Sequence, residues 1–369
     1  MRVITDIRYG PVRLTVSCAT EALDRIRGEL EPFFTFDEPT PGGARIATLT
    51  VHNEGAMHLI PSGPGVAVDV DTSLYKHLAS SGCRWGDDDR FAVRIDLTGT
   101  LLQFDRRASA IELWQPDENL ALIDTVRTVK SLFTPGLERI GCVQLHSAGV
   151  VDADGGILIL GDMWQGKTTL LLEFLSTFGV AQLSCDTVVA WRHDDGLVAA
   201  RGWPSPFSMS HGTMSDHPQL YSSYPIEQRK VPYDTRWQER KKTVLTSAQV
   251  VGLFETSLVP AVSRVHTVIV ARFKPAEETR IDTIASEEEL VAHLQAVYLG
   301  SRDPIYHNWH QYVTCADNSI NANIEKIARA LLQSADVHVM TWAPSASSLL
   351  KRIPRLARLH KTMRDIVDY

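Results

Sequence analysis

Residues 161–168 read Gly-Asp-Met-Trp-Gln-Gly-Lys-Thr and match the pattern GxxxxGK followed by Ser or Thr. The pattern is typical of loops that hold nucleotide phosphates, because its glycines let the backbone curl and aim successive amide groups at phosphate oxygens. In such a loop Lys167 reaches the β- and γ-phosphates, and the Thr168 hydroxyl binds Mg²⁺. The alternative is a glycine-containing turn with a coincidental lysine. We call Gly161–Thr168 the candidate phosphate loop.

The flanking sequence supplies the strand and the helix that such a loop requires. The apolar segment Ile157–Leu160 predicts a buried strand before it, and Thr168–Phe178, with leucines on one face, predicts a helix after it. Trp164 is unusual in a loop where small side chains avoid phosphate; its indole either lines an acceptor pocket or packs on the helix. The residues assigned to nucleotide binding are Gly161, Asp162, Met163, Trp164, Gln165, Gly166, Lys167, Thr168 and Thr169.

The N-terminal third predicts a different architecture from the rest. Strands are expected at Val12–Val16, Ile46–Val51, Val66–Val70 and Phe91–Leu97, with one helix at Glu21–Phe33. The acidic run Asp87–Asp89 lies beside Arg84 and Arg90, which favours a solvated loop over a metal site. From Asp117 the apolar residues recur at helical spacing. We therefore expect a β-rich accessory domain at 1–115 and a catalytic domain at 116–369.

Composition excludes several classes of protein. The 369 residues carry 37 Lys plus Arg and 44 Asp plus Glu, a net charge of −7 that argues against a dedicated nucleic-acid binder. No stretch is apolar enough for a membrane-spanning helix, and the first ten residues resemble no signal peptide. The five scattered cysteines form no CxxC pair. This pattern predicts a reducing, cytoplasmic location without membrane contact.

The segment His146–Ala190 resembles the catalytic core of the HPr kinase/phosphorylase family, especially the related enzymes of bacterial biosynthetic clusters. The family pattern has a histidine-bearing strand, a hairpin turn, a loop beginning Gly-Asp, a helix and a short strand with paired aspartates. Here His146, Asp152–Gly156 and Ser184-Cys185-Asp186 occupy those places. The resemblance implies an α/β fold with a P-loop kinase core of the HPr kinase/phosphoenolpyruvate carboxykinase type. That core has a mixed sheet and comes after the smaller β-rich domain.

The resemblance also implies roles for three residues. Lys167 neutralises the transferring phosphoryl group, while Asp186 orients or deprotonates the acceptor hydroxyl and helps Thr168 to hold Mg²⁺. His146 orients Asp186 or stabilises transferred charge. The alternative for Asp186 is an ordinary carboxylate at the end of a strand. The alternative for His146 is a strand histidine that is hydrogen-bonded to the backbone.

The chain departs from the family at two positions. Cys185 replaces one of the paired aspartates, and it is expected to be a small buried side chain rather than a nucleophile. Ala199 stands where a Glu-x-Arg-Gly element would have its glutamate, although Arg201-Gly202 is present. These differences weaken the expectation of phosphorolysis.

The acceptor is expected to meet the irregular segment 203–242, which ends in a basic cluster. Arg201, Lys241 and Lys242 are the candidate substrate residues, and the alternative is a solvated surface loop. His307 and His310 lack further ligands for zinc. The basic amphipathic segment Ser348–Tyr369 either packs on its own domain or grips a peptide, a second subunit or a membrane surface.

These patterns together predict a kinase that uses ATP, with GTP as the alternative, and Mg²⁺. Its acceptor is expected to be a hydroxyl of a small molecule or a peptide in a biosynthetic pathway. A protein-serine kinase and a nucleotide-binding switch without transfer activity are the alternatives. A homo-oligomer is left open.

Overall fold

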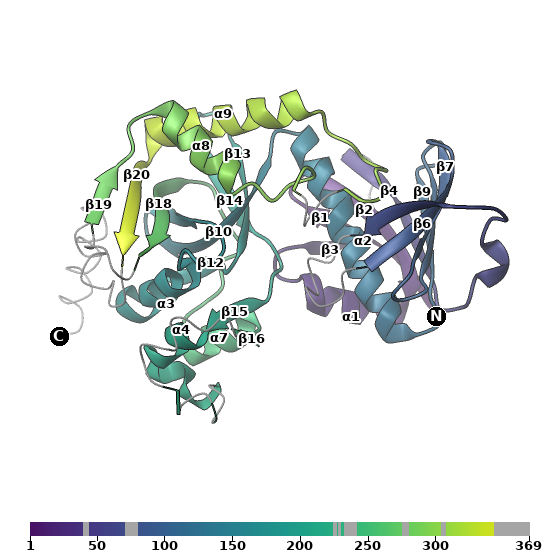
Figure 1. Cartoon of the computed structure of the whole chain (residues 1–369), viewed down its shortest axis with the longest axis horizontal. Helices are drawn as coiled ribbons and strands as arrows, with labels where there is room; N and C mark the ends of the chain where they lie inside the picture. Colours follow the sequence, from purple (N-terminus) through teal and green to yellow (C-terminus); the bar gives the residue numbers. More distant parts are fainter. Residues whose placement is uncertain are drawn as a thin grey trace. The chain divides into compact units, whose positions relative to one another are not determined.

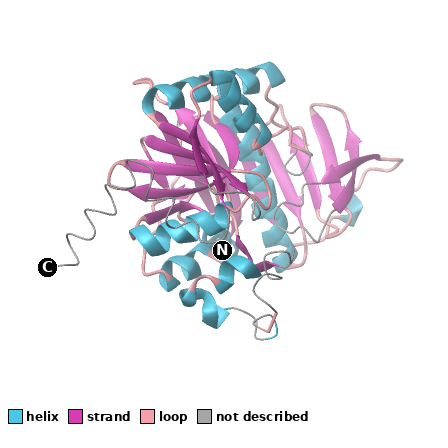
Figure 2. Ribbon diagram, turned by 60° about the vertical axis from the view of Figure 1, so that its left-hand side comes forward, coloured by secondary structure: helices cyan, strands magenta, loops and turns pink. Residues whose placement is uncertain are grey.

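The structure is a computed structural model that describes residues 1–39, 44–70, 80–223, 227, 230–231, 242–274, 280–303 and 308–342. The chain divides into two compact units, which Figures 1 and 2 show as separate sheets with their helices. Unit 1 is Met1–Val143 with Leu299–Asn321, and unit 2 is Gln144–Tyr298 with Ala322–Tyr369. None of the described helices combines the length and apolar character needed to span a bilayer.

Unit 1 is built on a mixed sheet whose described strands run in the order β3-β1-β2-β4-β9-β8-β7-β6-β5. Its elements are β1 (Arg2–Tyr9), β2 (Val12–Ala19), α1 (Thr20–Leu30), β3 (Thr35–Asp37), β4 (Ala44–His52), the 3₁₀ helix η1 (Met57–Leu59), β5 (Val66–Val70), β6 (Ser80–Gly86), β7 (Arg90–Ile95), β8 (Leu101–Asp105), β9 (Ala110–Trp114) and α2 (Glu118–Arg139). In β4, Ala47, Leu49 and Val51 are buried at alternate positions, as the strand period of two requires. The strands and the helix expected here are confirmed.

The helix α2 belongs to unit 1, and this differs from the expected boundary at residue 115. It starts at Asp117, whose side chain accepts from the backbone N–H groups of Asn119 and Leu120. It packs beside α1 and on β2 and β4. The change from strand to helix periodicity marks the next element of the same unit, because an amphipathic helix needs a sheet face to cover.

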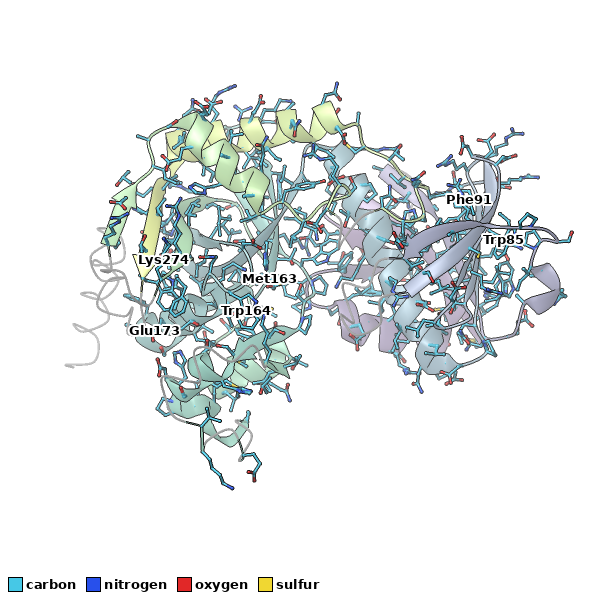
Figure 3. The ribbon with its side chains drawn as sticks, in the orientation of Figure 1. Trp85, Phe91, Met163, Trp164, Glu173 and Lys274 are labelled. Carbon is cyan, nitrogen blue, oxygen red and sulfur yellow. The ribbon has the colours of Figure 1, made fainter. Side chains whose placement is uncertain are left out.

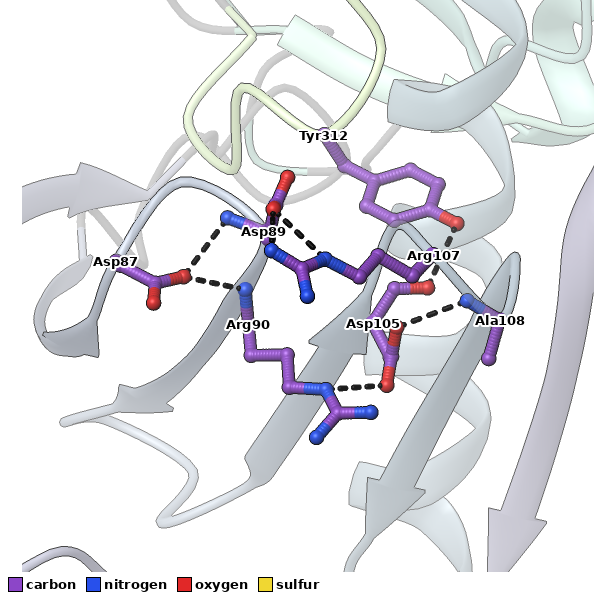
Figure 4. A network of polar contacts seen from close by, with 7 residues as sticks. All are labelled: Asp87, Asp89, Arg90, Asp105, Arg107, Ala108 and Tyr312. Carbon is purple, nitrogen blue, oxygen red and sulfur yellow. Dashed lines mark hydrogen bonds and ion pairs between the residues drawn. The ribbon is translucent and has the colours of Figure 1, made fainter.

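The acidic run in unit 1 forms hairpin turns and ion pairs (Figure 4). One Asp87 carboxylate oxygen accepts from the backbone N–H groups of Asp89 and Arg90, and these bonds hold the pKa of the Asp87 carboxyl below its ordinary value. Asp89 pairs with Arg107 at 2.6 Å, and Arg90 pairs with Asp105 at 2.7 Å. These carboxylates therefore connect the β6–β7 and β8–β9 turns.

Unit 2 is a second mixed sheet, in the described order β17-β14-β13-β10-β11-β18-β20-β19, with β12 also pairing with β10. Its strands are β10 (Val143–Asp152), β11 (Gly155–Leu160), β12 (Ala181–Ser184), β13 (Thr187–Arg192), β14 (Val198–Gly202), β17 (Ala261–Val262), β18 (Val265–Phe273), β19 (Arg280–Thr283) and β20 (Asp336–Trp342). The helix α3 (Lys167–Phe178) lies on one face, and α8 (Glu287–Ala296) and α9 (Asp317–Ser334) lie on the other (Figures 1 and 2).

Strand direction in unit 2 gathers several chain segments at one sheet edge. β11, β18 and β20 are parallel neighbours, so Leu160, Phe273 and Trp342 all lie at the same edge. β10 is antiparallel to β11 and pairs Ser147 with Leu160. His146, the preceding residue of β10, is therefore brought next to the start of the candidate phosphate loop.

A small helical and hairpin subdomain covers α3. It consists of the strand pair β15 (Phe207–Ser210) and β16 (Lys242–Leu245), with α4 (His211–Ser215), the 3₁₀ helix η2 (Pro218–Ser223) and α7 (Ser247–Leu253). Phe207, Met209, Met214, Leu220 and Val250 share one buried cluster with the leucines of α3. The stretch 207–220 is thus packed on α3, whereas Glu227, Lys230 and Lys242 are exposed.

His217 is a buried histidine in this subdomain. It is 3% exposed, and its Nε2 atom has no hydrogen-bond partner among the described residues, with Glu173 Oε1 4.0 Å away. Burial lowers the pKa of His217 from 6.5 to about 4. The carboxylate favours the charged form, but at this distance its effect is smaller than that of burial.

We predict that unit 2 loses stability as the pH falls from 6.5 to about 4. In this window the unfolded state binds a proton at His217 and the folded state does not, so the free energy of unfolding falls, by up to about 3 kcal/mol. His217→Gln should flatten the dependence of the melting temperature on pH, whereas His193→Gln, at an exposed turn, should preserve it. An unchanged profile for His217→Gln would exclude this role.

Candidate active site

The candidate phosphate loop connects β11 to α3, which is the strand, loop and helix order expected from the sequence. Gly166 caps α3 in the left-handed conformation with φ 85°, and Trp164 is also left-handed with φ 68°. Alternating left- and right-handed residues turn successive backbone N–H groups into one concavity, which suits an anion. Figure 3 labels Met163 and Trp164 on this loop; they are 41% and 40% exposed.

The loop is held by the ends of two neighbouring strands. A Cβ atom on Gly166 would overlap the ring of Trp342, the last residue of β20. The Trp342 indole N–H donates to the Gln165 carbonyl oxygen at 3.3 Å. The backbone N–H of Phe273, at the end of β18, donates to Gln165 Oε1 at 3.2 Å. Glycine at 166 is thus required by packing as well as by its positive φ.

Three predicted site residues meet at one nitrogen atom. His146 Nε2 lies 2.9 Å from Lys167 Nζ and 3.1 Å from Asp186 Oδ1. Lys167 Nζ also donates to the Asp162 carbonyl oxygen at 3.2 Å. Lys167 and His146 are buried, while Asp186 is half-buried. The motif, the strand histidine and the carboxylate, which are far apart in the sequence, therefore form one cluster.

The chemistry of imidazole restricts how this cluster is bonded. An ammonium group only donates, a carboxylate only accepts, and Nε2 of a neutral imidazole does one or the other. His146 Nε2 can therefore accept from Lys167 or donate to Asp186, but it cannot do both at once. If a phosphate drew Lys167 away, the competing donor would be removed, and the imidazole tautomer that carries its proton on Nε2 could donate to Asp186.

Asp186 is placed by the turn between β12 and β13. Its carbonyl oxygen accepts from the backbone N–H of Ser147, so the turn is tied to β10 beside His146. Cys185 is 3% exposed, and its Sγ atom donates to the Ser205 carbonyl oxygen at 3.3 Å. The cysteine is buried as expected. Ala199 is fully buried on β14, opposite Trp191 of β13.

The backbone conformation of Trp164 is unfavourable for a residue with a side chain. A left-handed residue other than glycine costs about 1–2 kcal/mol. Lys242 Nζ lies over the indole ring, 4.6 Å from its centroid. A cation–π contact at an exposed site is worth only about 0.5–1 kcal/mol. This contact therefore does not offset the backbone strain. The contact that the structure gives the indole is thus with Lys242 at the start of β16.

A chain of hydroxyl groups joins the first turn of α3 to the hairpin. Thr169 Oγ1 lies 2.6 Å from Thr213 Oγ1, which lies 2.9 Å from Ser210 Oγ. Ser210 also caps α4 through the Thr213 backbone N–H. Thr169 thus contacts the hairpin, and its neighbour Thr168 is the half-buried residue at the start of α3.

The other predicted residues divide between β14, unit 1 and segments outside the description. Arg201 lies on β14, opposite Val189 of β13 and Ala261 of β17. Lys241, His307 and the segment Ser348–Tyr369 lie outside the described residues. His310 belongs to unit 1, where it is fully buried and lies 3.2 Å from the Ser131 hydroxyl.

Several residues that shape the site carry no signal in the sequence. Trp342 and Phe273 act on the loop from strands that come more than 100 residues after it. Ser210 and Thr213 reach α3 from the segment 203–242, which the sequence predicted to be irregular. A Ser before a short helix is a capping signal, and it is the one local feature that could have located Ser210.

The residues present are compatible with Mg²⁺. Thr168 and Asp186 offer hydroxyl and carboxylate oxygens, the hard ligands that this ion prefers, and phosphate and water oxygens commonly complete its shell. Among the described residues, no group of three His, Cys, Asp or Glu side chains could hold a metal.

Comparisons with known proteins add little. No family model matches the chain, and no curated protein is similar to it. Among solved structures, the HPr(Ser) kinase/phosphatase from Coxiella burnetii is similar over 60% of this chain and 98% of its own, with 13% identity and a TM-score of 0.26. Such a score is below the level that indicates a shared fold. The function is therefore inferred from the residues of this chain.

We predict that Gly166→Ala destabilises the protein more than Gly196→Ala does. Both glycines have φ near +86°, at 85° and 87°, so each alanine costs about 1 kcal/mol of backbone strain. Gly196 has only an Arg192 atom at 3.7 Å, whereas Gly166 meets Trp342. Chemical denaturation should show a further loss of about 1–3 kcal/mol for Gly166→Ala. Equal losses would show that the Trp342 ring moves freely.

Proposed function

We propose that this protein is a kinase that transfers the γ-phosphoryl group of ATP, or alternatively GTP, to a hydroxyl of a small molecule or peptide. The observation that carries the proposal is the cluster of Lys167, His146 and Asp186 beside the candidate phosphate loop. The Lys167 ammonium, which can bind phosphate, and the Asp186 carboxylate, which can accept a hydroxyl proton, both lie within hydrogen-bond distance of His146 Nε2. This arrangement supplies both partners that phosphoryl transfer needs.

In the proposed reaction the acceptor oxygen forms a bond to the γ-phosphorus as the bond to the β,γ-bridging oxygen breaks. The acceptor proton passes to the Asp186 carboxylate. The loop amides, the amino end of α3 and Lys167 neutralise the phosphate charge. Once Lys167 binds phosphate, the ring proton of His146 shifts from Nδ1 to Nε2, and this tautomer donates to Asp186 and fixes its orientation.

Thr168 and Asp186 are the proposed Mg²⁺ ligands. When bound with the nucleotide, the ion would add positive charge beside the β- and γ-phosphates. Asp186 is half-buried, so its carboxylate is partly accessible from solvent, which both metal binding and proton transfer need.

One observation favours a second function, a nucleotide-dependent switch. Residue 185 is a buried cysteine that is hydrogen-bonded to the Ser205 carbonyl oxygen. The second aspartate of the family pattern is therefore missing, and Asp186 is the one carboxylate of the pair. A protein that binds nucleotide and transfers little would release ADP slowly and independently of any acceptor. The protein-serine kinase alternative depends on the C-terminal segment Ser348–Tyr369, which lies outside the described residues.

We predict that Lys167→Ala abolishes transfer, because the buried ammonium would no longer meet the β- and γ-phosphates. ADP release should be measured with ATP, Mg²⁺ and pools of hydroxyl metabolites and peptides, followed by mass spectrometry for the gain of one phosphoryl group. Lys326→Ala, on the exposed face of α9, should retain full turnover. Unchanged turnover in Lys167→Ala would exclude the proposed reaction, and acceptor-independent ADP release would favour the switch.

We predict that Asp186→Asn lowers the rate of transfer by about 10²–10⁴-fold, the usual contribution of a general base. Asparagine keeps the size of the side chain but cannot take the acceptor proton. The rate should be compared at saturating ATP and Mg²⁺, so that weaker metal binding does not contribute. A loss confined to the KM for Mg·ATP would show that Asp186 only holds the metal.

A further inference from the structure

Lys242 is a second cation beside the candidate phosphate loop, and the GxxxxGK pattern does not include it. Its ammonium lies over the Trp164 ring, 4.6 Å from the centroid. Unlike Lys167, which is buried in the cluster with His146, Lys242 is exposed. The two lysines therefore approach the loop from different elements, one from α3 and one from β16.

The position of Lys242 is fixed by more than its contact with the indole. Lys242 pairs with Ser210 in the β15–β16 register, and Ser210 is joined through Thr213 to Thr169 in the first turn of α3. The hairpin end is thus attached to the same turn that carries Lys167 and Thr168. Displacement of the hairpin backbone from α3 would break the hydrogen bonds of this chain, whereas the Lys242 side chain can move without breaking them.

The strained backbone of Trp164 indicates that the indole has a functional role at this position. Glycine would adopt φ 68° without cost, and the contact with Lys242 is weaker than the strain it accompanies. Strain of this kind is retained mainly where a ligand or a reaction makes use of it. The contact with Lys242 alone therefore does not explain why tryptophan occupies the loop.

We propose that Lys242 binds the γ-phosphate of the nucleoside triphosphate. Trp164 is a positioning residue that holds the Lys242 ammonium at the loop. Phosphate oxygens form charge-assisted hydrogen bonds, which are stronger than an exposed cation–π contact, so Lys242 leaves the indole when nucleotide binds. Its long, flexible side chain allows this short movement. The inference rests on the proposed function, since it requires nucleotide at the loop.

This role gives Lys242 a distinct effect on nucleotide choice. Lys167 and the loop amides meet the β-phosphate of ATP and ADP alike. A cation that reaches the terminal phosphate from the hairpin acts on ATP and on the transition state, where charge lies on the transferring group. Lys242 should therefore raise the preference for ATP over ADP and the rate of transfer.

The test compares Lys242→Met, Trp164→Gly, Trp164→Phe and the double variant Lys242→Met/Trp164→Gly. Calorimetric titration with Mg·ATP and Mg·ADP should show roughly tenfold weaker ATP binding for Lys242→Met and a smaller change for ADP, as expected for one lost charge-assisted contact. Trp164→Phe retains an aromatic ring face for the Lys242 ammonium, so its affinity for Mg·ATP should be close to that of the parent protein. Lys326→Met is the matched control for removal of an exposed lysine.

The double variant distinguishes positioning from an independent effect. If Trp164 acts through Lys242, the double variant binds ATP no more weakly than Lys242→Met alone. Multiplied losses would overturn the positioning role. Trp164→Gly relieves the strained backbone, so its melting temperature should equal or exceed that of the parent, and this outcome separates lost recognition from unfolding.

Two patterns of failure have different meanings. If the parent protein binds ATP, Lys167→Ala abolishes binding or transfer, and Lys242→Met matches Lys326→Met for both nucleotides, the role of Lys242 is overturned and the proposed function stands. If the parent protein binds neither nucleotide, the proposed function fails, and this inference fails with it. Equal weakening of ATP and ADP by Lys242→Met would overturn its contact with the terminal phosphate.

Discussion

The ring of Trp342 occupies the space that a side chain at position 166 would need, and this contact determines the course of the candidate phosphate loop. Since Trp342 ends β20 and also donates to the Gln165 carbonyl oxygen, the loop runs along the edge of the sheet. Phe273 fixes the same glutamine from β18. The direction of α3, and with it the position of Lys167, depends on these two strand ends.

The main polar feature beside this packing is His146 Nε2, which lies close to both the Lys167 ammonium and the Asp186 carboxylate. A buried ammonium group needs a partner, because burial removes it from water. His146 and the Asp162 carbonyl oxygen are partners of the Lys167 ammonium. The half-buried Asp186 distinguishes this cluster from the fully buried ion pair of Asp124 and Arg127 in unit 1.

Local sequence patterns predicted the elements of the site well. The apolar run Ile157–Leu160, the glycines of the loop and the leucines of Thr168–Phe178 predicted the observed strand, loop and helix, since the type of each element follows from the spacing of its own residues. The placement of His146 and Asp186 came from the family resemblance, because nothing in their own surroundings distinguishes them. The boundary at residue 115 differed from the observed units, because periodicity reports the type of an element and not the sheet on which it packs.

By itself the sequence determined the loop chemistry: a lysine, a threonine and flexible glycines after a buried strand. The tertiary structure decided what surrounds that loop. The register between β10 and β11 places His146 beside it, the parallel order of β11, β18 and β20 brings Phe273 and Trp342 to it, and the β15–β16 pair brings Lys242 over Trp164. Such contacts join residues up to 177 positions apart, and they depend on strand order, which no local pattern of side chains specifies.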